Sequence, residues 1–436
     1  MSIELISALL FGLLLILLLT GLPVSFVLGG IAVVFTYFLW GPQGLAMVAN
    51  RAWGGMTSFP IVCVPLFIYM GVMLERSGIA SSLYTMMHRW SGALRGGLAA
   101  GTVLICMLFA AMTGLSGAST VALGLVALPE MLKRGYNKDI AIGSIGGGGA
   151  LGILIPPSVT MVIYAMIAQE SVGQLFMGGV FPGIVLGFLF IAYILIRSAI
   201  QKNIAPALPL EERAGWGAKF TSLRAVILPM LLIVAVLGSI FRGIATPTEA
   251  AAVGAFGATI CAAVYRQLNW QNIKDACYQT LRVSTMALWI FLGSQAFTTI
   301  YYAVGAQEFV QGLLLQLPGG NWGVIIGMQV IWLLLGCLLD PWGIILITAP
   351  IFVPVVASLG FSLVWFGVLC IVNMEMAYLT PPFGMNLFYL KGVAPPEVSM
   401  GDIYHSATPF VICQLVALII VMVFPALVLW LPSLMF

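Results

Sequence analysis

Charged side chains are scarce in this chain of 436 residues: 7% are Asp, Glu, Lys or Arg, whereas 61% are hydrophobic. Soluble domains carry about 25% charged residues, so this composition excludes an ordinary soluble protein. It predicts an all-α membrane protein with room for about ten spans of about 20 residues each, embedded in a lipid bilayer. Apolar runs place the candidate spans near residues 4–20, 24–40, 54–74, 138–168, 175–197, 225–241, 247–265, 283–303, 363–390 and 408–430. The basic residues behind the net charge of +3 are spread over separate loops, so no nucleic-acid partner is expected.

Residues that carry catalysis or bind metals are also rare. The chain has two histidines, His88 and His405, and its seven cysteines form no C-x-x-C motif. A histidine or cysteine metal cluster is therefore not expected, and the cysteines are interpreted as small buried hydrophobic residues. No G-x-x-x-x-G-K-[ST] motif is present, so the chain is not expected to consume ATP, and we predict that it is not an enzyme.

What the chain does contain is a repeated interruption of its apolar segments. Proline pairs occur at Pro156-Pro157 and at Pro381-Pro382, an offset of 381 − 156 = 225. The same offset relates Pro129 to Pro354. Broken apolar segments at matching places in two halves are the strongest sequence indication of a transporter's binding site.

Two further segments are predicted to enter the membrane and return. Residues 94–134 begin and end beside basic residues, and their middle is a polar, glycine-containing stretch from Thr113 to Thr120. Residues 321–358 lie in a region without Lys or Arg between Arg282 and Lys391. Because basic residues mark the cytoplasmic side, the first hairpin enters from the cytoplasm and the second from outside. Irregular backbone at that depth must line a cavity or be buried in protein, so both tips are expected at one site.

The two halves are therefore predicted to be inverted repeats, because each has five crossings, an odd number. The first repeat covers residues 1–197 with a broken helix at 138–168, and the second covers 225–436 with a broken helix at 363–390. Residues 198–224 are the predicted cytoplasmic linker. Both termini lie outside in this arrangement.

A helix interrupted in the membrane exposes N–H groups that suit an anion, and carbonyl groups that, with hydroxyls, suit a hard cation such as Na⁺. Each half offers such oxygens beside its breaks. The candidate groups are Ser116, Ser119, Thr120 and Ser158 in the first half and Asp340, Thr348, Thr380 and Asn386 in the second. Kinks and close helix packing are the alternative explanation of the prolines and glycines. Asp340 can equally be a functional acid or the N-cap of a helix. Glu375 is interpreted as a hydrogen-bonding partner inside the protein, with proton coupling as the alternative.

The sequences GALGILIPPS (149–158) and EMAYLTPPFGMNLFYLKGV (375–393) resemble those of the large membrane subunit of tripartite ATP-independent periplasmic (TRAP) transporters. The resemblance covers the whole chain. It implies an elevator mechanism and Na⁺-coupled uptake across the bacterial inner membrane. It also implies two partners, a small four-helix membrane subunit and a periplasmic substrate-binding protein.

The resemblance assigns sodium ligands to each hairpin tip and the broken helix that follows it. They are Ser116, Gly117, Ser119, Gly152, Ile155 and Pro157 for one site and Gly336, Asp340, Thr348, Thr380, Pro382 and Asn386 for the other. The substrate, a small organic anion in this family, is expected between the tips. Its expected contacts are Thr113, Ser116, Ser158, Asp340, Thr348 and Asn386. The Asp-Pro-Trp and Phe-Tyr-Leu-Lys-Gly-Val segments look more like branches handling monocarboxylates or 2-oxo acids than like the sialic-acid branch.

Three alternatives stay open at this level. A stand-alone organic-anion carrier or exchanger of the same architecture would need no partner subunits. An intramembrane enzyme would need a nucleophile and base or a metal, for which two histidines offer little. A passive channel is disfavoured by the small residues that close both tips.

Overall fold

In the computed structural model, which describes residues 2–91 and 93–435, all regular structure of those residues is helical. Helices suit apolar segments in a bilayer because each helix pairs its own backbone polar groups. Eight of the described helices are long and apolar enough to cross a membrane, or nine if one bent pair counts as a single span. The predicted all-α membrane fold is confirmed.

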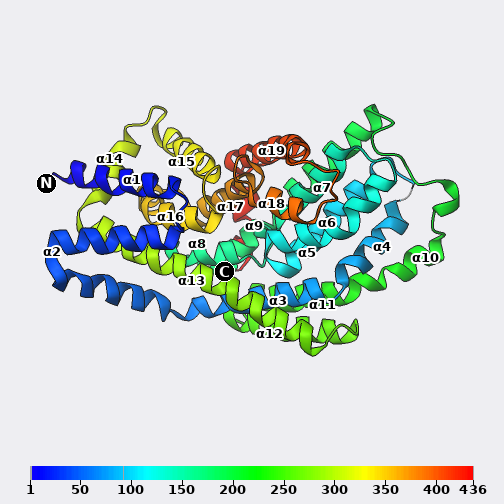
Figure 1. Cartoon of the computed structure of the whole chain (residues 1–436), viewed down its shortest axis with the longest axis horizontal. Helices are drawn as coiled ribbons and strands as arrows, with labels where there is room; N and C mark the ends of the chain where they lie inside the picture. Colours follow the sequence, from blue (N-terminus) through cyan, green and yellow to red (C-terminus); the bar gives the residue numbers. More distant parts are fainter. Residues whose placement is uncertain (1, 92, 436) are drawn as a thin grey trace.

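The helices follow one another with short connections (Figure 1). Those of the first half are α1 (Ile3–Leu19), α2 (Val24–Met56), α3 (Cys63–Arg76), α4 (Ile79–Ser91), α5 (Gly97–Thr113), α6 (Ser116–Lys133), α7 (Lys138–Ala150), α8 (Val159–Ala168) and α9 (Val172–Ile200). Then come α10 (Trp216–Ser222), α11 (Arg224–Phe241), α12 (Pro247–Val264), α13 (Trp270–Ala303), α14 (Ala306–Leu315), α15 (Gly320–Gly336), α16 (Pro341–Ser358), α17 (Leu363–Leu379), α18 (Met385–Val393), α19 (Met400–Val423) and α20 (Ala426–Leu429). Single 3₁₀ turns occur at Phe59–Val62, Leu151–Ile153, Leu210–Glu212 and Pro432–Leu434.

Corresponding helices of the two halves begin at the offset seen in the sequence. Helix α6 begins at Ser116 and α16 at Pro341, and 341 − 116 = 225. Helix α7 begins at Lys138 and α17 at Leu363, which is again 363 − 138 = 225. The same local rules therefore set the helix starts in both halves.

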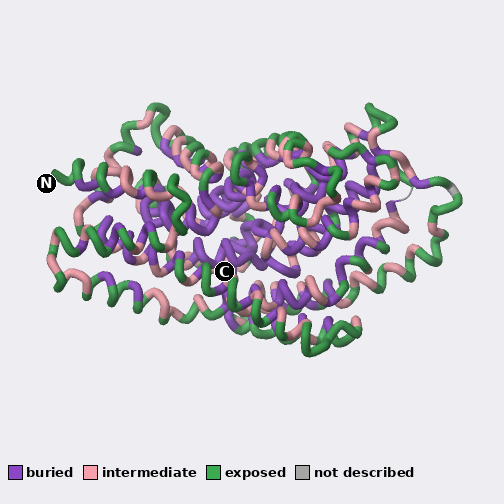
Figure 2. The backbone as a smooth tube through the Cα atoms, viewed as in Figure 1, coloured by how far each residue is buried: buried purple, intermediate pink, exposed green. Residues whose placement is uncertain are grey.

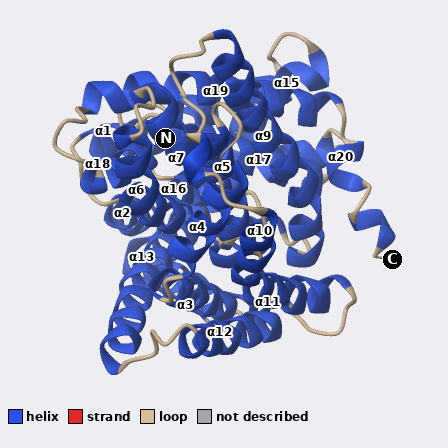
Figure 3. Cartoon of the chain, turned by 90° about the vertical axis from the view of Figure 1, so that its right-hand side faces the viewer, coloured by secondary structure: helices blue, strands red, loops and turns tan. Residues whose placement is uncertain are grey.

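The helices form two groups that meet along α3 and α13. Helices α2, α3, α11, α12 and α13 pack on one another and are called the long-helix layer; α3, α11, α12 and α13 lie together at the lower side of Figure 3. Helices α5 to α9 and α15 to α19 pack on one another above them and are called the hairpin body. Because both hairpins belong to the hairpin body, their tips can face a surface of the long-helix layer.

The hairpin body also holds the most deeply buried backbone, drawn purple in Figure 2. In the apolar span of α16, 83% of the residues are buried, against 28% in the span Trp216–Phe241 that contains α11. Helix α16 is thus surrounded by protein, whereas α11 leaves most of its apolar side chains at least partly exposed, as a helix facing lipid does.

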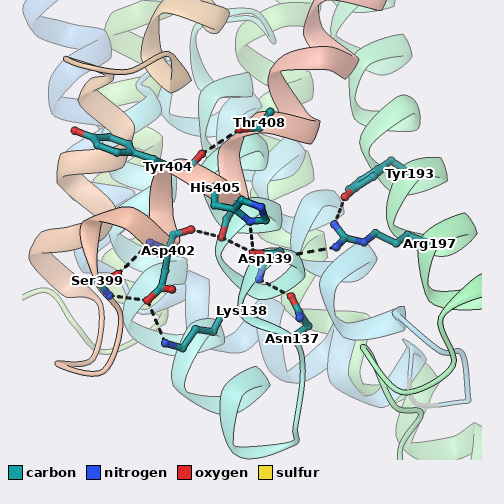
Figure 4. Close-up of polar contacts among 11 residues, drawn as sticks. Asn137, Lys138, Asp139, Tyr193, Arg197, Ser399, Asp402, Tyr404, His405 and Thr408 are labelled. Atoms are coloured by element: carbon teal, nitrogen blue, oxygen red, sulfur yellow. Dashed lines mark hydrogen bonds and ion pairs between the residues drawn. The ribbon is translucent and has the colours of Figure 1, made fainter.

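A polar cluster joins the two halves at one end of the hairpin body (Figure 4). The Asp139 carboxylate on α7 accepts from His405 Nδ1 of α19 at 3.0 Å and from Arg197 Nη2 of α9 at 3.4 Å. Beside it, Lys138 Nζ lies 3.1 Å from Asp402 Oδ2. The start of α7 is therefore held to α9 and α19 by charged groups.

The long-helix layer differs most from the sequence-based expectation. Helix α2 continues past the break at Gly41, where φ is 71°, to Met56, whereas a span had been expected to begin near residue 54. Helix α13 begins at Trp270 and not near 283, because its first turns carry charged residues that lower the hydropathy without breaking the helix. Helices α4 and α14 were also not predicted; α14 is bent against α15 by 113°.

Candidate functional site

The first hairpin turns at Gly114, whose φ of 64° is in the left-handed region that glycine adopts without strain. The tip then packs directly on the break between α7 and α8. A Cβ placed on Gly152 would lie 2.6 Å from the Leu115 carbonyl oxygen, and one on Gly114 would lie 2.3 Å from the carbonyl oxygen of Pro157. Both glycines are required for this close approach of two backbone segments.

Hydroxyl groups pair the tip with the broken helix. Ser119 Oγ lies 3.1 Å from the carbonyl oxygen of Ser116 and 3.3 Å from that of Gly149. Thr120 Oγ1 donates to the same Ser116 carbonyl at 3.0 Å. Ser116, Ser119 and Thr120 are all buried. The tip thus concentrates oxygen atoms in a small buried volume.

The proline pair adds carbonyl groups to this volume. In an unbroken helix the carbonyls of Gly152 and Ile153 would accept from residues 156 and 157, but proline has no N–H to donate. Ser158 Oγ donates to the Ile153 carbonyl at 2.5 Å and caps α8 by accepting from Met161 N at 3.3 Å. The break is therefore stabilised locally, and both proline pairs, Pro156-Pro157 and Pro381-Pro382, are joined by cis peptide bonds.

The second tip is built in a similar way. Asp340 is the N-cap of α16, and its Oδ2 accepts from Gly343 N at 3.1 Å. Gly336 faces the broken helix, since a Cβ there would lie 2.5 Å from Ala377 Cβ. Pro381 and Pro382 cannot donate to the carbonyls of Ala377 and Tyr378. The end of α15 and the break after α17 are therefore in contact.

Three contacts bring the two halves together. Trp342 Nε1 on α16 donates to Thr160 Oγ1 on α8 at 3.0 Å. Asn386 Nδ2 on α18 donates to the Gly146 carbonyl on α7 at 3.4 Å. A Cβ on Gly117 would lie 2.9 Å from the Tyr389 ring. Each broken helix thus contacts an element of the other half.

A cavity of about 930 Å³ lies between the two tips and α13. Ser116 and Gly117 line it from the first tip, and Asp340 and Trp342 from the second. Tyr378 and Tyr389 line it from the second broken helix. The structure therefore brings the predicted tip residues to one space, which is large enough for a small organic solute.

The opposite wall carries charged residues that are not among the predicted site residues. Glu75 and Arg76 contribute from α3, and Asp275 and Arg282 from α13. The position of Arg76 near the end of a predicted span is typical of an arginine that reaches the membrane interface, but its Nη1 lies 3.0 Å from Asp275 Oδ2 on the cavity wall. The spacing of Asp275, Gln279, Arg282 and Met286 places them on one face of a helix, a signal that was available in the sequence.

Other predicted site residues lie behind the cavity surface. Thr113 Oγ1 donates to the Phe109 carbonyl at 2.9 Å, and Thr380 Oγ1 to the Met376 carbonyl at 2.6 Å. Thr348 Oγ1 accepts from Trp332 Nε1 at 2.6 Å. These residues are not among those that line the cavity, and neither are Ser119, Gly152, Ile155, Pro157, Ser158, Gly336, Pro382 and Asn386.

Glu375 is fully buried away from this cavity. Among the described residues, neither of its carboxylate oxygens has a hydrogen-bond partner, and the same is true of the side-chain amide of Gln414. Gln414 is the side chain with which Glu375 would bond, so the interpretation of Glu375 as a hydrogen-bonding partner inside the protein stays a prediction.

The donors at both tips are oxygens of carbonyl, hydroxyl and carboxylate groups. Within residues 2–91 and 93–435 there is no group of three or more His, Cys, Asp or Glu residues that could hold a metal ion. A transition-metal site is thus not formed by those side chains, whereas oxygen donors of this kind suit a hard monovalent or divalent cation.

Comparison with known proteins identifies a family. Residues 11–427 match the model of the tripartite ATP-independent periplasmic transporter, DctM component. The C4-dicarboxylate TRAP transporter large permease protein DctM of Pseudomonas aeruginosa is 34% identical over 405 residues, 93% of each chain. The protein of the same name from Rhodobacter capsulatus is 34% identical over 98% of this chain and 99% of its own. The ectoine TRAP transporter large permease protein TeaC of Halomonas elongata is 29% identical over 96% and 97%.

Solved structures agree in fold. The YdaH transporter of Alcanivorax borkumensis superposes with a TM-score of 0.62 at 17% identity, over 94% of this chain and 98% of its own. MtrF of Neisseria gonorrhoeae, described as one of a class of antimetabolite efflux pumps, gives a TM-score of 0.62 at 13% identity, over 88% and 85%. At such identities the likeness concerns the fold.

Proposed function

The chain belongs to the DctM component family of tripartite ATP-independent periplasmic transporters, and on that basis we propose that it imports a small carboxylate solute by sodium coupling. Its relatives are large permease proteins, so the chain is a multi-pass membrane transporter subunit and not an enzyme. The proposed partners are a small four-helix membrane subunit and a periplasmic binding protein that delivers the solute. The proposed location is the bacterial inner membrane.

The charge balance of the cavity supports sodium coupling. Its lining includes three carboxyl groups, on Glu75, Asp275 and Asp340, against two guanidinium groups, on Arg76 and Arg282. With all five ionised the wall carries one net negative charge, which opposes the entry of an anion. One Na⁺ at an oxygen-rich tip neutralises that charge, and one at each tip makes it positive, so cation binding is the step that admits the solute.

The tips offer suitable places for the ion. At the first, the hydroxyl of Ser119 lies within hydrogen-bond distance of the carbonyl oxygens of Ser116 and Gly149. At the second, Asp340 adds a negative charge beside the break. Na⁺ prefers such oxygen ligands, and binding there would order the backbone of both breaks before the solute arrives.

The two groups of helices suggest how the loaded site moves. The cavity lies between the hairpin body, which supplies the tips, and α3 and α13 of the long-helix layer. We propose an elevator movement in which the hairpin body carries Na⁺ and solute along that layer towards the cytoplasm. The contacts between the halves, at the tips and in the polar cluster around Asp139, keep the hairpin body rigid during the movement.

The cavity and the relatives indicate the class of solute. Relatives are named for C4-dicarboxylate, ectoine and sialic acid, and each of these compounds carries a carboxylate. Arg282, which lines the cavity, is a suitable partner for such a group. A small carboxylate is therefore the proposed substrate.

Reconstituted uptake tests the proposal. The chain is placed in proteoliposomes with its small membrane subunit, and uptake of the carboxylate delivered by the binding protein is followed with an inward Na⁺ gradient. We expect uptake only with that gradient and with the binding protein present. Equal uptake with choline replacing Na⁺ on both sides would contradict sodium coupling, and equal uptake without the binding protein would favour a stand-alone carrier.

A further inference from the structure

A second pocket, of about 500 Å³, lies far from the tips, between α4, the junction of α10 with α11, and the end of α12. Arg89 lines it from α4 and Arg224 from the start of α11. None of the described residues that line it is acidic. Two guanidinium groups facing one pocket repel each other unless an anion lies between them, so this pocket is built for a negative group.

Hydroxyl groups complete the polar wall. Ser81, Thr85 and Arg89 follow one another at intervals of four residues on the exposed face of α4, whose other face is buried through Ile79 and Leu83. Such a spacing aligns the three side chains along one side of a helix. The polar side of α4, which includes Arg89, therefore faces the pocket that Arg224 lines from α11.

The guanidinium groups retain free donors. Arg89 uses one N–H for a 3.5 Å bond to the Ala218 carbonyl on α10. A guanidinium has five N–H donors in a planar fork, which matches the oxygens of a phosphate group. Trp90 Nε1 also donates to the Lys219 carbonyl at 3.1 Å. This bond and the bond from Arg89 to Ala218 hold α10 against α4.

The surroundings are those of a membrane interface. Phe220 of α10 packs edge-on against Trp90 at 6.0 Å and stacks with Trp216 at 6.2 Å. Lys219 lies over the Trp216 ring at 4.9 Å. Amphipathic aromatic and basic residues gather at the level of the lipid headgroups, so α10 is suited to lie there.

An apolar track leads away from the pocket. Its wall includes Leu228 and Val264, and the outward side chains of α11 and α12 continue the apolar surface. Ile227, Leu231 and Val234 on α11 are 56–61% exposed, and Phe256 on α12 is 70% exposed. A free phosphate would leave this track unused, whereas the acyl chains of a phospholipid would cover it.

We propose that this pocket binds the headgroup of an anionic phospholipid, with the phosphate between Arg89 and Arg224 and the acyl chains along α11 and α12. The lipid would fix α10 and the segment between the two halves to the long-helix layer. This site is independent of the solute cavity and of sodium coupling.

Lipid retention tests the proposal. The purified full-length chain is incubated with equal amounts of phosphatidylglycerol and phosphatidylcholine in detergent, and bound lipids are counted by native mass spectrometry. We expect preferential retention of phosphatidylglycerol, lowered about fivefold by Arg224→Gln and largely kept by Arg224→Lys. Lys202→Gln removes another exposed positive charge of the segment between the two halves (198–224). This variant is the matched control and should retain lipid like the wild type.

Three results would overturn the assignment. They are equal retention of the two lipids by the wild type, equal retention by Arg224→Gln and Lys202→Gln, and displacement of phosphatidylglycerol by millimolar inorganic phosphate. The last would make the pocket a site for a free anion. Arg224 is exposed, so its substitution should leave folding intact, and a melting curve in phosphatidylcholine checks this.

Discussion

The indole N–H of Trp342 donates to the hydroxyl of Thr160, 3.0 Å away and 182 residues earlier in the chain. One residue belongs to the second hairpin and the other to the first broken helix, and both line the cavity between the tips. The bond therefore ties the two halves together at the surface where the solute is proposed to bind.

Thr160→Val tests this connection. The substitution keeps the side-chain shape and leaves the Trp342 N–H without its acceptor, which costs about 1 kcal/mol or more. We expect a lower melting temperature and slower uptake. Thr285→Val is the control, because the Thr285 hydroxyl is exposed and bonds within its own helix. If both variants behave alike, the bond does not hold the two halves together.

Gly152→Ala probes the contact between the first tip and its broken helix. The added Cβ would lie 2.6 Å from the Leu115 carbonyl oxygen and 2.8 Å from Ser116 Cα, backbone atoms that cannot rotate away. Overpacking of this kind costs about 1–3 kcal/mol. We expect the Na⁺ concentration for half-maximal uptake to rise, measured at saturating solute.

The control for this change is Gly30→Ala in α2, where a Cβ would meet nothing within 4 Å. It should leave both uptake and the Na⁺ dependence unchanged. An unaltered Na⁺ dependence in Gly152→Ala would argue against a sodium site at the first tip.

Asp139 is expected to hold the end of the hairpin body together. It is 19% exposed and faces His405 and Arg197 from two other helices, so Asp139→Ala should lower the free energy of unfolding by about 1–2 kcal/mol. Lys138→Ala removes a more exposed pair, with Asp402, and should cost less. Thermal melts of both variants decide this, and a larger loss in Lys138→Ala would contradict it.

Much of the fold could be predicted because its strongest signals are local. Proline and glycine interrupt the helices around Pro156 and Pro381. The region between Arg282 and Lys391 has no Lys or Arg, and this distinguishes the second hairpin from the segments that are predicted to be cytoplasmic. The first turns of α13 were missed because Lys274, Asp275 and Arg282 lower the hydropathy by which spans are recognised. The inverted orientation of the repeats stays a prediction.

The site could be predicted only in part, for a related reason. Its tips follow from breaks in the chain, so Ser116 and Asp340 were selected and both line the cavity. Its opposite wall depends on the pairing of Arg76 with Asp275, residues 199 positions apart, and no periodicity connects them. Residues behind the tips, such as Thr348, are predicted because a hydroxyl beside a helix break suits Na⁺, whereas here the Thr348 hydroxyl accepts from Trp332 Nε1.

Arg282 is expected to recognise the solute. It lines the cavity, and no ion pair of its side chain is found within the described part of the chain, unlike Arg76. Arg282→Gln should raise the KM for the carboxylate about tenfold at saturating Na⁺ and leave the Na⁺ dependence unchanged. Lys274→Gln, an exposed change on the same helix, serves as the control, and Arg282→Lys should recover part of the affinity. A normal KM in Arg282→Gln would place the carboxylate elsewhere.

Asp340 has two roles that can be separated, because it both caps α16 and brings a negative charge to the cavity. Asparagine is an equally good N-cap, so Asp340→Asn should keep the bond to Gly343 N and change stability by less than about 0.5 kcal/mol. It removes the charge, and we expect Na⁺-driven uptake to fall by about tenfold or more.

Asp340→Ala loses the cap as well and should lower stability by about 1 kcal/mol. Asn269→Ala, which removes a cap at the exposed start of α13, shows the cost of cap loss alone. Uptake by Asp340→Asn at the wild-type rate would show that Asp340 is only a helix cap, and the charge that attracts Na⁺ would then have to come from Glu75 or Asp275.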